Sequence, residues 1–134
     1  MIVAPDMTVV ARQCILDGLA ALGVPAQPVS TRTPNPRPTS ERFITFQVLG
    51  GRKKNLRIAQ HMVVALVHDK VANEVACRRA AYQVAAVLED AANTVGPVLA
   101  AAVESVVASD DPSVSAACRY QVTVSWTVSY PTTP

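Results

Sequence analysis

The sequence of 134 residues is poor in charged and in aromatic side chains. Charged residues make up 16% and aromatic residues 4%, whereas an average protein has about a quarter of its residues charged. Because half of the residues are hydrophobic, this composition excludes a disordered chain and indicates a core built mostly from Ala and Val. The formal net charge of +2 is far from the strongly basic balance of a dedicated nucleic-acid-binding domain.

Long hydrophobic runs are also missing from the sequence. The longest, at residues 62–67 and 97–103, are much shorter than the roughly 18 to 20 residues of a membrane-spanning helix. The first residues, Met1 to Asp6, lack the positive and apolar regions of a secretion signal. We therefore expect no membrane partner, and assembly in the cytoplasm of the cell that makes the protein.

Residues that carry catalysis or bind metals are few, and their spacing is unfavourable. His61 and His68 are seven residues apart on or near one predicted strand, so they are expected to point to opposite faces. The three cysteines, Cys14, Cys77 and Cys118, are widely spaced and are predicted to be buried small hydrophobic residues. We expect no catalytic, cofactor-binding or metal-binding residues and no enzyme activity; a small hydrolase that uses Cys118 or His61 is the less favoured alternative.

Hydrophobic periodicity predicts two helices. Apolar residues at three- and four-residue spacing indicate a helix over residues 7–22, with Asp6 as its N-cap and Gly23 just after its end. A second helix, rich in alanine, is predicted over residues 70–94 with Asp69 as its cap. Alanine permits a close approach of this helix to a sheet.

Alternating and β-branched segments predict four strands, at residues 42–49, 56–67, 97–107 and 119–130. The pair Gly50-Gly51 is interpreted as the turn of a hairpin. The order α-β-β-α-β-β then predicts a two-layer α+β fold, in which an antiparallel four-stranded sheet carries the helices on one face. We expect a single domain over residues 1–134.

A proline-rich arm at residues 25–41 interrupts this pattern. Its prolines remove backbone donors and favour extended conformations, so no regular helix or strand is expected within it. A loop of this length that prolines restrict is typical of an ordered contact arm, and a passive crossover is the alternative. The last residues, 131–134, are predicted to form a loose tail.

Four features of the chain occur together in a characteristic order. They are the opening helix ending in Leu22-Gly23-Val24, the arm Val29–Pro38 leading into the strand Arg42–Val48, the Gly50-Gly51 hairpin followed by a strand and an Ala-rich helix, and the Asp111-Pro112 turn before Arg119–Val124. In this order and spacing the chain resembles the tail terminator (tail completion) family of long non-contractile-tailed bacteriophages. The resemblance covers nearly the whole chain.

The resemblance implies a structural virion protein without enzyme activity or cofactor. Such a protein forms a hexameric ring that caps the tail tube, ends tube polymerisation and provides the interface for head–tail joining at the neck end of the tail. The implied partners are further copies of the chain, the tail tube protein and a head-side connector protein, with only weak non-specific contact to DNA in the lumen. A head–tail connector or neck adaptor protein is the alternative.

Two sets of residues are candidates for these contacts. The arm set, predicted to touch a neighbouring subunit or ring, is Arg32, Pro34, Pro36, Arg37 and Arg42. The basic tip of the hairpin, predicted to face the lumen or the tube, is Arg52, Lys53 and Lys54. In a channel that passes DNA, a weakly basic lining aids passage without tight binding. A free arm and a solvated tip are the alternatives.

Overall fold

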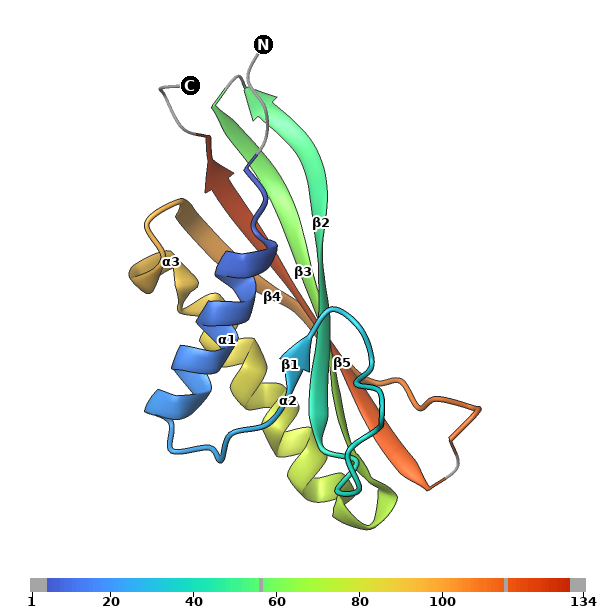
Figure 1. The fold of residues 1–134 in the computed structure, drawn as a ribbon. Helices are drawn as coiled ribbons and strands as arrows, with labels where there is room; N and C mark the ends of the chain where they lie inside the picture. The colour runs from blue at the N-terminus through green and yellow to red at the C-terminus, as the bar shows by residue number, and fades with distance from the viewer. Residues whose placement is uncertain (1–4, 56, 115, 131–134) are drawn as a thin grey trace.

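A five-stranded sheet and a layer of helices on one of its faces form the fold (Figure 1). The structure is a computed structural model that describes residues 5–55, 57–114 and 116–130. The strands, in the spatial order β1-β2-β3-β5-β4, are β1 (Val29–Ser30), β2 (Phe43–Asn55), β3 (Ile58–Lys70), β4 (Val98–Ala108) and β5 (Ala117–Ser129). The helices are α1 (Thr8–Ala21), α2 (Glu74–Glu89) and the short α3 (Ala91–Thr94), with a 3-10 turn at Val71–Asn73.

The α+β class is as predicted, but the sheet is not the expected four-stranded antiparallel one. An additional strand, β1, lies inside the arm and pairs in parallel with β2, with Val29 opposite Ile44. The amide of Ile44 also donates to the carbonyl of Pro28 at 2.9 Å. Between Pro28 and Pro34 the backbone keeps its donors, so this short stretch can join the sheet where the rest of the arm cannot.

The predicted turn at Gly50-Gly51 is wrong, because β2 continues through both glycines to Asn55. The pairing with β3 shifts register between Gly50 and Lys53, which marks a bulge. A Cβ on Gly51 would lie 2.1 Å from the carbonyl oxygen of Gln60, so the bulge requires glycine there. The basic residues Arg52, Lys53 and Lys54 are therefore the end of a strand and not a turn.

The first helix agrees with its predicted extent, although its N-cap residue is Met7 and not Asp6, and the second helix differs from its prediction. The Asp6 carboxylate accepts the Thr8 amide at 2.9 Å, and Gly23 adopts a φ of +76° after α1. The single helix expected over residues 70–94 is divided into the 3-10 turn, α2 and α3. Asp90 lies between α2 and α3, where its carboxylate accepts from the Asn93 side chain (3.0 Å) and its carbonyl accepts from the Thr94 hydroxyl (3.3 Å).

The core lies between the helices and one face of the sheet. Its largest fully buried side chains include Trp126, Phe46, Ile15 and Leu88, and the Trp126 indole donates to the Leu88 carbonyl at 2.9 Å. The predicted alternation of the last strand is confirmed, since Tyr120, Val122, Val124, Trp126, Val128 and Tyr130 are all buried. Among the described residues, none of the helices has the length and apolar character needed to cross a membrane.

Candidate assembly surfaces

A second, smaller cluster lies on the sheet face opposite the helices. Phe43 and His68 are directly opposite each other on β2 and β3, and both are buried. Their chain neighbours Ile44 and Val67 belong to the main core, so alternation places Phe43 and His68 on the other face. The rings of Phe43 and His68 stack with centroids 4.1 Å apart, and Thr45 lies 3.3 Å from the His68 ring nitrogen Nε2.

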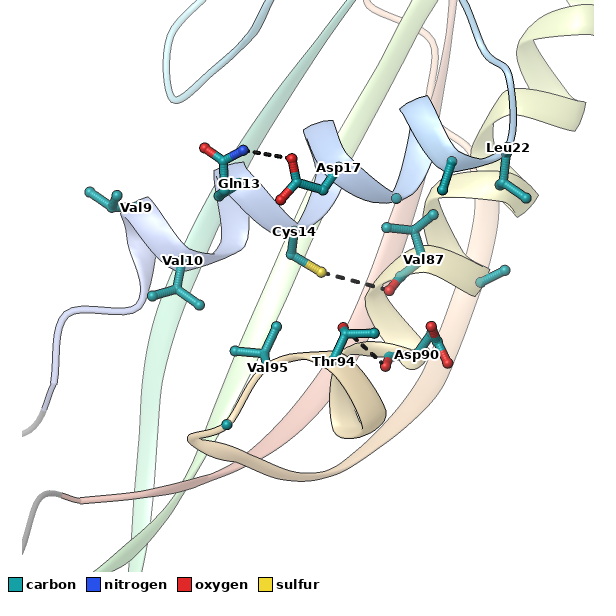
Figure 2. Close-up of a pocket in the computed structure, with 14 residues that line it drawn as sticks. Val9, Val10, Gln13, Cys14, Asp17, Leu22, Val87, Asp90, Thr94 and Val95 are labelled. Atoms are coloured by element: carbon teal, nitrogen blue, oxygen red, sulfur yellow. Dashed lines mark hydrogen bonds between the residues drawn. The ribbon is translucent and has the colours of Figure 1, made fainter.

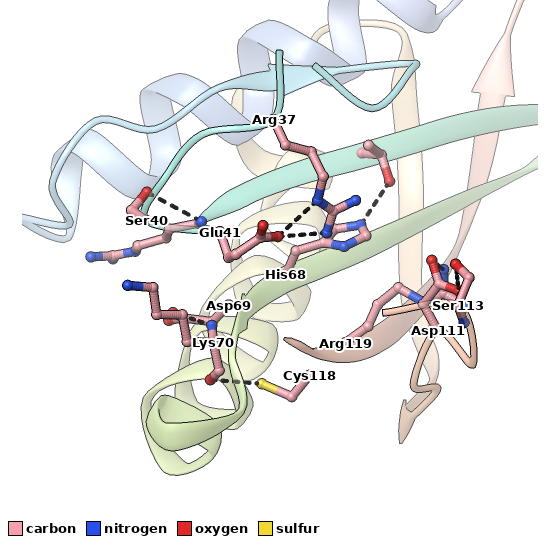
Figure 3. A network of polar contacts seen from close by, with 12 residues as sticks. Arg37, Ser40, Glu41, His68, Asp69, Lys70, Asp111, Ser113, Cys118 and Arg119 are labelled. Carbon is pink, nitrogen blue, oxygen red and sulfur yellow. Dashed lines mark hydrogen bonds and ion pairs between the residues drawn. The ribbon is translucent and has the colours of Figure 1, made fainter. Parts of the chain in front are cut away.

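The arm covers this cluster with an ion pair (Figure 3). The Arg37 guanidinium lies 4.9 Å from the centre of the Phe43 ring and 2.6 Å from the Glu41 carboxylate. Glu41 has a φ of 57°, a left-handed conformation that is uncommon outside glycine. We name Arg37, Glu41, Phe43 and His68 the arm cluster; it holds the end of the arm against the sheet.

His68 is uncharged at neutral pH in this environment. Burial lowers its pKa to about 4, and the positive charges of Arg119 and Arg37 act in the same direction. The carboxylates of Asp111 and Glu41 act in the opposite direction and do not outweigh them. His68 is thus a neutral packing residue under the arm.

The structure places the predicted arm contacts in different settings. Arg32 and Pro36 are exposed, whereas Pro34 and Arg42 are half-buried. Arg37 is engaged within its own chain by Glu41 and Phe43. Their contacts with a neighbouring subunit stay a prediction, for which Arg32 and Pro36 are the most accessible members.

Three basic residues at the end of β2 have exposed side chains: Arg52, Lys53 and Lys54. We name these three residues the basic strand end. Lys53 lies with its Nζ 5.1 Å from the centre of the Tyr130 ring, on the neighbouring part of the sheet. None of the ion pairs within the described part of the chain involves the basic strand end. Its positive charge is therefore available to a partner.

A groove between α1, α2 and α3 was not predicted from the sequence (Figure 2). It has a volume of about 930 Å³, and most of its lining is apolar, including Val9, Val10, Leu22, Val87 and Val95. The sequence feature that could have indicated the groove is the presence of apolar residues on all sides of α1. Val9 is 76% exposed, although Ile15 on the other face is fully buried. An apolar groove of this size on a surface is typical of a contact site.

Cys14 lines the groove and is half-buried, so the prediction of three buried cysteines is wrong for this residue. It sits on the α1 side that α2 covers only in part, where its thiol donates to the Val87 carbonyl at 3.7 Å. Burial, together with the charges of Asp90 and Asp17, raises the pKa of Cys14 to about 11. Cys77 and Cys118 are buried as predicted.

The residues of the alternative hydrolase prediction lie far apart. Cys118 is opposite Asp69 on β3, and His61 is eight residues away along the same strand, a distance of about 26 Å at 3.3 Å per residue. Burial raises the pKa of Cys118 and lowers that of His61. As predicted, the two histidines are on opposite faces, because His61 pairs with the core residue Trp126. Within residues 5–55, 57–114 and 116–130, no three potential metal ligands of the His, Cys, Asp and Glu types gather.

Comparison with known proteins shows a similar fold in a solved structure and no match by sequence. No protein-family model matches the chain, and no curated protein sequence matches it. A chain in a solved structure, described as the virion of a native gene transfer agent (GTA) particle, has a similar fold with a TM-score of 0.59. The similarity covers 84% of this chain and 84% of that chain at 16% sequence identity.

Proposed function

We propose that this protein is a structural component of a virion, of the tail terminator type. In this role six copies form a ring that caps the tail tube, ends its polymerisation and provides the surface for head–tail joining. The observation that carries the proposal is the fold shared with a chain of a virion particle. The order of sequence features that resembles tail terminators supports the finer assignment.

The surfaces of the chain support a role in assembly. A closed ring needs a heterologous interface, in which two different patches of one subunit meet across a rotation. The apolar groove on the helical side and the arm on the opposite sheet face are different surfaces of one chain, each available for contacts with a neighbouring subunit or ring. Capping then requires that one side of the ring match the tube while the other does not repeat the docking surface of the tube.

A non-catalytic role is part of the proposal. A cysteine nucleophile needs a lowered pKa and a neighbouring base. Burial instead raises the pKa of the Cys118 thiol, and His61 lies far from it along β3. The partners are then proteins: further copies, the tail tube protein and a head-side connector. DNA passing the lumen makes weak contact with the basic strand end.

The mass of the purified protein in solution tests this proposal, measured by light scattering before and after mixing with tail tube protein. Tube lengths are measured on the same samples by electron microscopy. We expect a ring of six that binds tube ends and shortens the tubes. A ring that binds the portal side and leaves tube length unchanged would favour the connector alternative, and a monomer indifferent to tubes would contradict the proposal.

A further inference from the structure

One border of the sheet is a long and nearly uncharged strand. β4 has 11 residues, VLAAAVESVVA, with Glu104 as its one charge. It pairs with β5 on one side only and is the last strand of the sheet. Leu99 and Val107 are 53% and 48% exposed along it. Proteins usually protect such a strand with several charges, a proline, bulges or a cover, because its free backbone groups pair with other chains. β4 shifts register against β5 at Val98–Ala100 and at Val103–Ser105, but it has one charge and no proline.

The opposite border of the sheet is also open over part of its length. β1 covers β2 only at Ile44 and Thr45, and Thr31 and Thr33 of the arm line a small pocket together with Gln47. From Val48 to Asn55, no described residue pairs with the outer side of β2. This open stretch contains the basic strand end and no acidic residue.

The two open borders are complementary in direction and in charge. Successive neighbours from β2 through β3 and β5 to β4 are antiparallel, so β2 and β4 run in opposite directions. A second copy placed beside the first with its sheet in the same orientation therefore presents β4 antiparallel to β2. One border carries a single carboxylate, Glu104, and the other three cations, which favours this pairing over the pairing of two like borders.

We propose that β4 of one copy pairs with residues 48–55 of β2 in the next copy, which continues the sheet from subunit to subunit. The occupant of each open border is thus a second copy of this chain. Because the two borders are different, the contact is heterologous and closes into a ring when the rotation permits it. Residues 31–33 of the arm follow β1 toward the start of the open stretch, so a neighbouring β4 also lies near Arg32. This interface rests on the proposed ring, whose contacts it specifies.

The double variant Leu99→Lys and Val107→Lys tests the interface. Both side chains are exposed, so the variant keeps the folded subunit but places two charges on the open border. The matched control is Val71→Lys with Val75→Lys, which are 54% and 59% exposed near the start of α2 and outside the groove. We expect loss of the ring in the edge variant and a ring of normal mass in the control.

Hydrogen exchange on the unmodified protein gives a second measurement that does not depend on a variant. In the ring, the amides of β4 and of residues 48–55 are expected to exchange more slowly than in dilute subunits. Three results would overturn the interface. One is fast exchange in both segments of the ring, another is an edge variant that still forms rings, and the third is a wild-type chain that never oligomerises. Edge-paired rings without any effect on tube length would instead overturn the capping function alone.

Discussion

The rings of Phe43 and His68 stack at a centroid distance of 4.1 Å and an angle of 15°, on the sheet face that the helices leave uncovered. The arm closes over this pair, with the Arg37 guanidinium 4.9 Å from the Phe43 ring. A charge on His68 would be buried beside Arg37 and Arg119, whose positive charges oppose its protonation. The attachment of the arm to the sheet therefore depends on a neutral histidine.

Acidification is expected to destabilise the protein through His68. Its pKa is about 4 in the folded chain and 6.5 in the unfolded chain, so the unfolded state binds more protons between these values. Stability is then complete above about pH 6.5 and falls as the pH decreases toward 4, by about 2 to 3 kcal/mol. Urea unfolding measured at intervals from pH 7.5 to 4.5 gives the free energy of unfolding as a function of pH.

The variant His68→Phe isolates this contribution, because phenylalanine retains a stacked ring without a titrating group. We expect a flatter pH profile for the variant than for the wild type, with any remaining slope due to carboxylates whose pKa is lowered in the folded chain, such as Asp111. Equal slopes for the two proteins would show that His68 titrates normally.

Two neighbouring glycines are expected to respond very differently to substitution by alanine. In Gly51→Ala the new Cβ would meet the Gln60 carbonyl oxygen at 2.1 Å, so the backbone of β2 or β3 has to shift. We expect a loss of about 1 to 3 kcal/mol of stability. Gly50→Ala is the matched control, since no atom lies within 4 Å of its added Cβ, and its effect should be within about 0.5 kcal/mol. Chemical denaturation distinguishes the two, and equal losses would contradict the bulge.

The approach of α1 to α2 depends on Gly18. A Cβ at this position would lie 2.2 Å from Cγ1 of Val87, so Gly18→Ala separates the helices or displaces Val87. We expect a loss of about 1 to 3 kcal/mol despite the higher helix propensity of alanine. In the double variant with Val87→Ala, the clash is removed, and its loss of stability should be smaller than the sum of the two single losses. Additive losses in thermal unfolding would show that the helices are not in close contact there.

The sequence was sufficient for the elements whose patterns are local. The alternation from Tyr120 to Tyr130 and the extent of α1 follow from side-chain periodicity and from the glycine after the helix, which depend on neighbouring residues only. The Gly50-Gly51 pair has the same local pattern as a turn. Its actual role depends on the close approach of Gln60 in another strand, which no local pattern reveals.

The candidate contacts were predictable to a smaller extent. The arm was identifiable by its prolines, but the ion pair of Arg37 with Glu41 occurs outside a helix, where a spacing of four residues has no fixed meaning. The strand β1 has only two residues, Val29 and Ser30, which is too short for an alternating pattern in the sequence. The groove requires α1, α2 and α3 to be placed together, and only the apolar outer face of α1 indicated it.

The arm is expected to contribute to ring contacts through its arginines. Changing Arg32 and Arg37 together to Glu reverses two charges of the arm, and we expect loss of ring formation and of tail capping. Because Arg37 also binds Glu41 within its own chain, Glu41→Gln is the control that breaks the ion pair and keeps both arginines. Normal rings and normal capping in the double variant would refute this role of the arm, as would equal loss in the control.

The basic strand end is expected to give the ring a weak and salt-dependent affinity for DNA. Its three cations are exposed and outside the ion pairs of the described residues, so each can neutralise a phosphate. Changing Arg52, Lys53 and Lys54 to Gln should reduce the slope of log affinity against log salt by about 2 to 3. The slopes are compared on samples whose ring mass has been measured by light scattering, because the same residues lie in the stretch of β2 proposed to pair with the next copy. The control replaces three cations on or beside α2, namely Lys70, Arg78 and Arg79, and should keep the wild-type slope. Binding of short duplex DNA measured by fluorescence anisotropy at several salt concentrations gives these slopes, and an equal reduction in both variants would assign the affinity to total charge instead of to the end of β2.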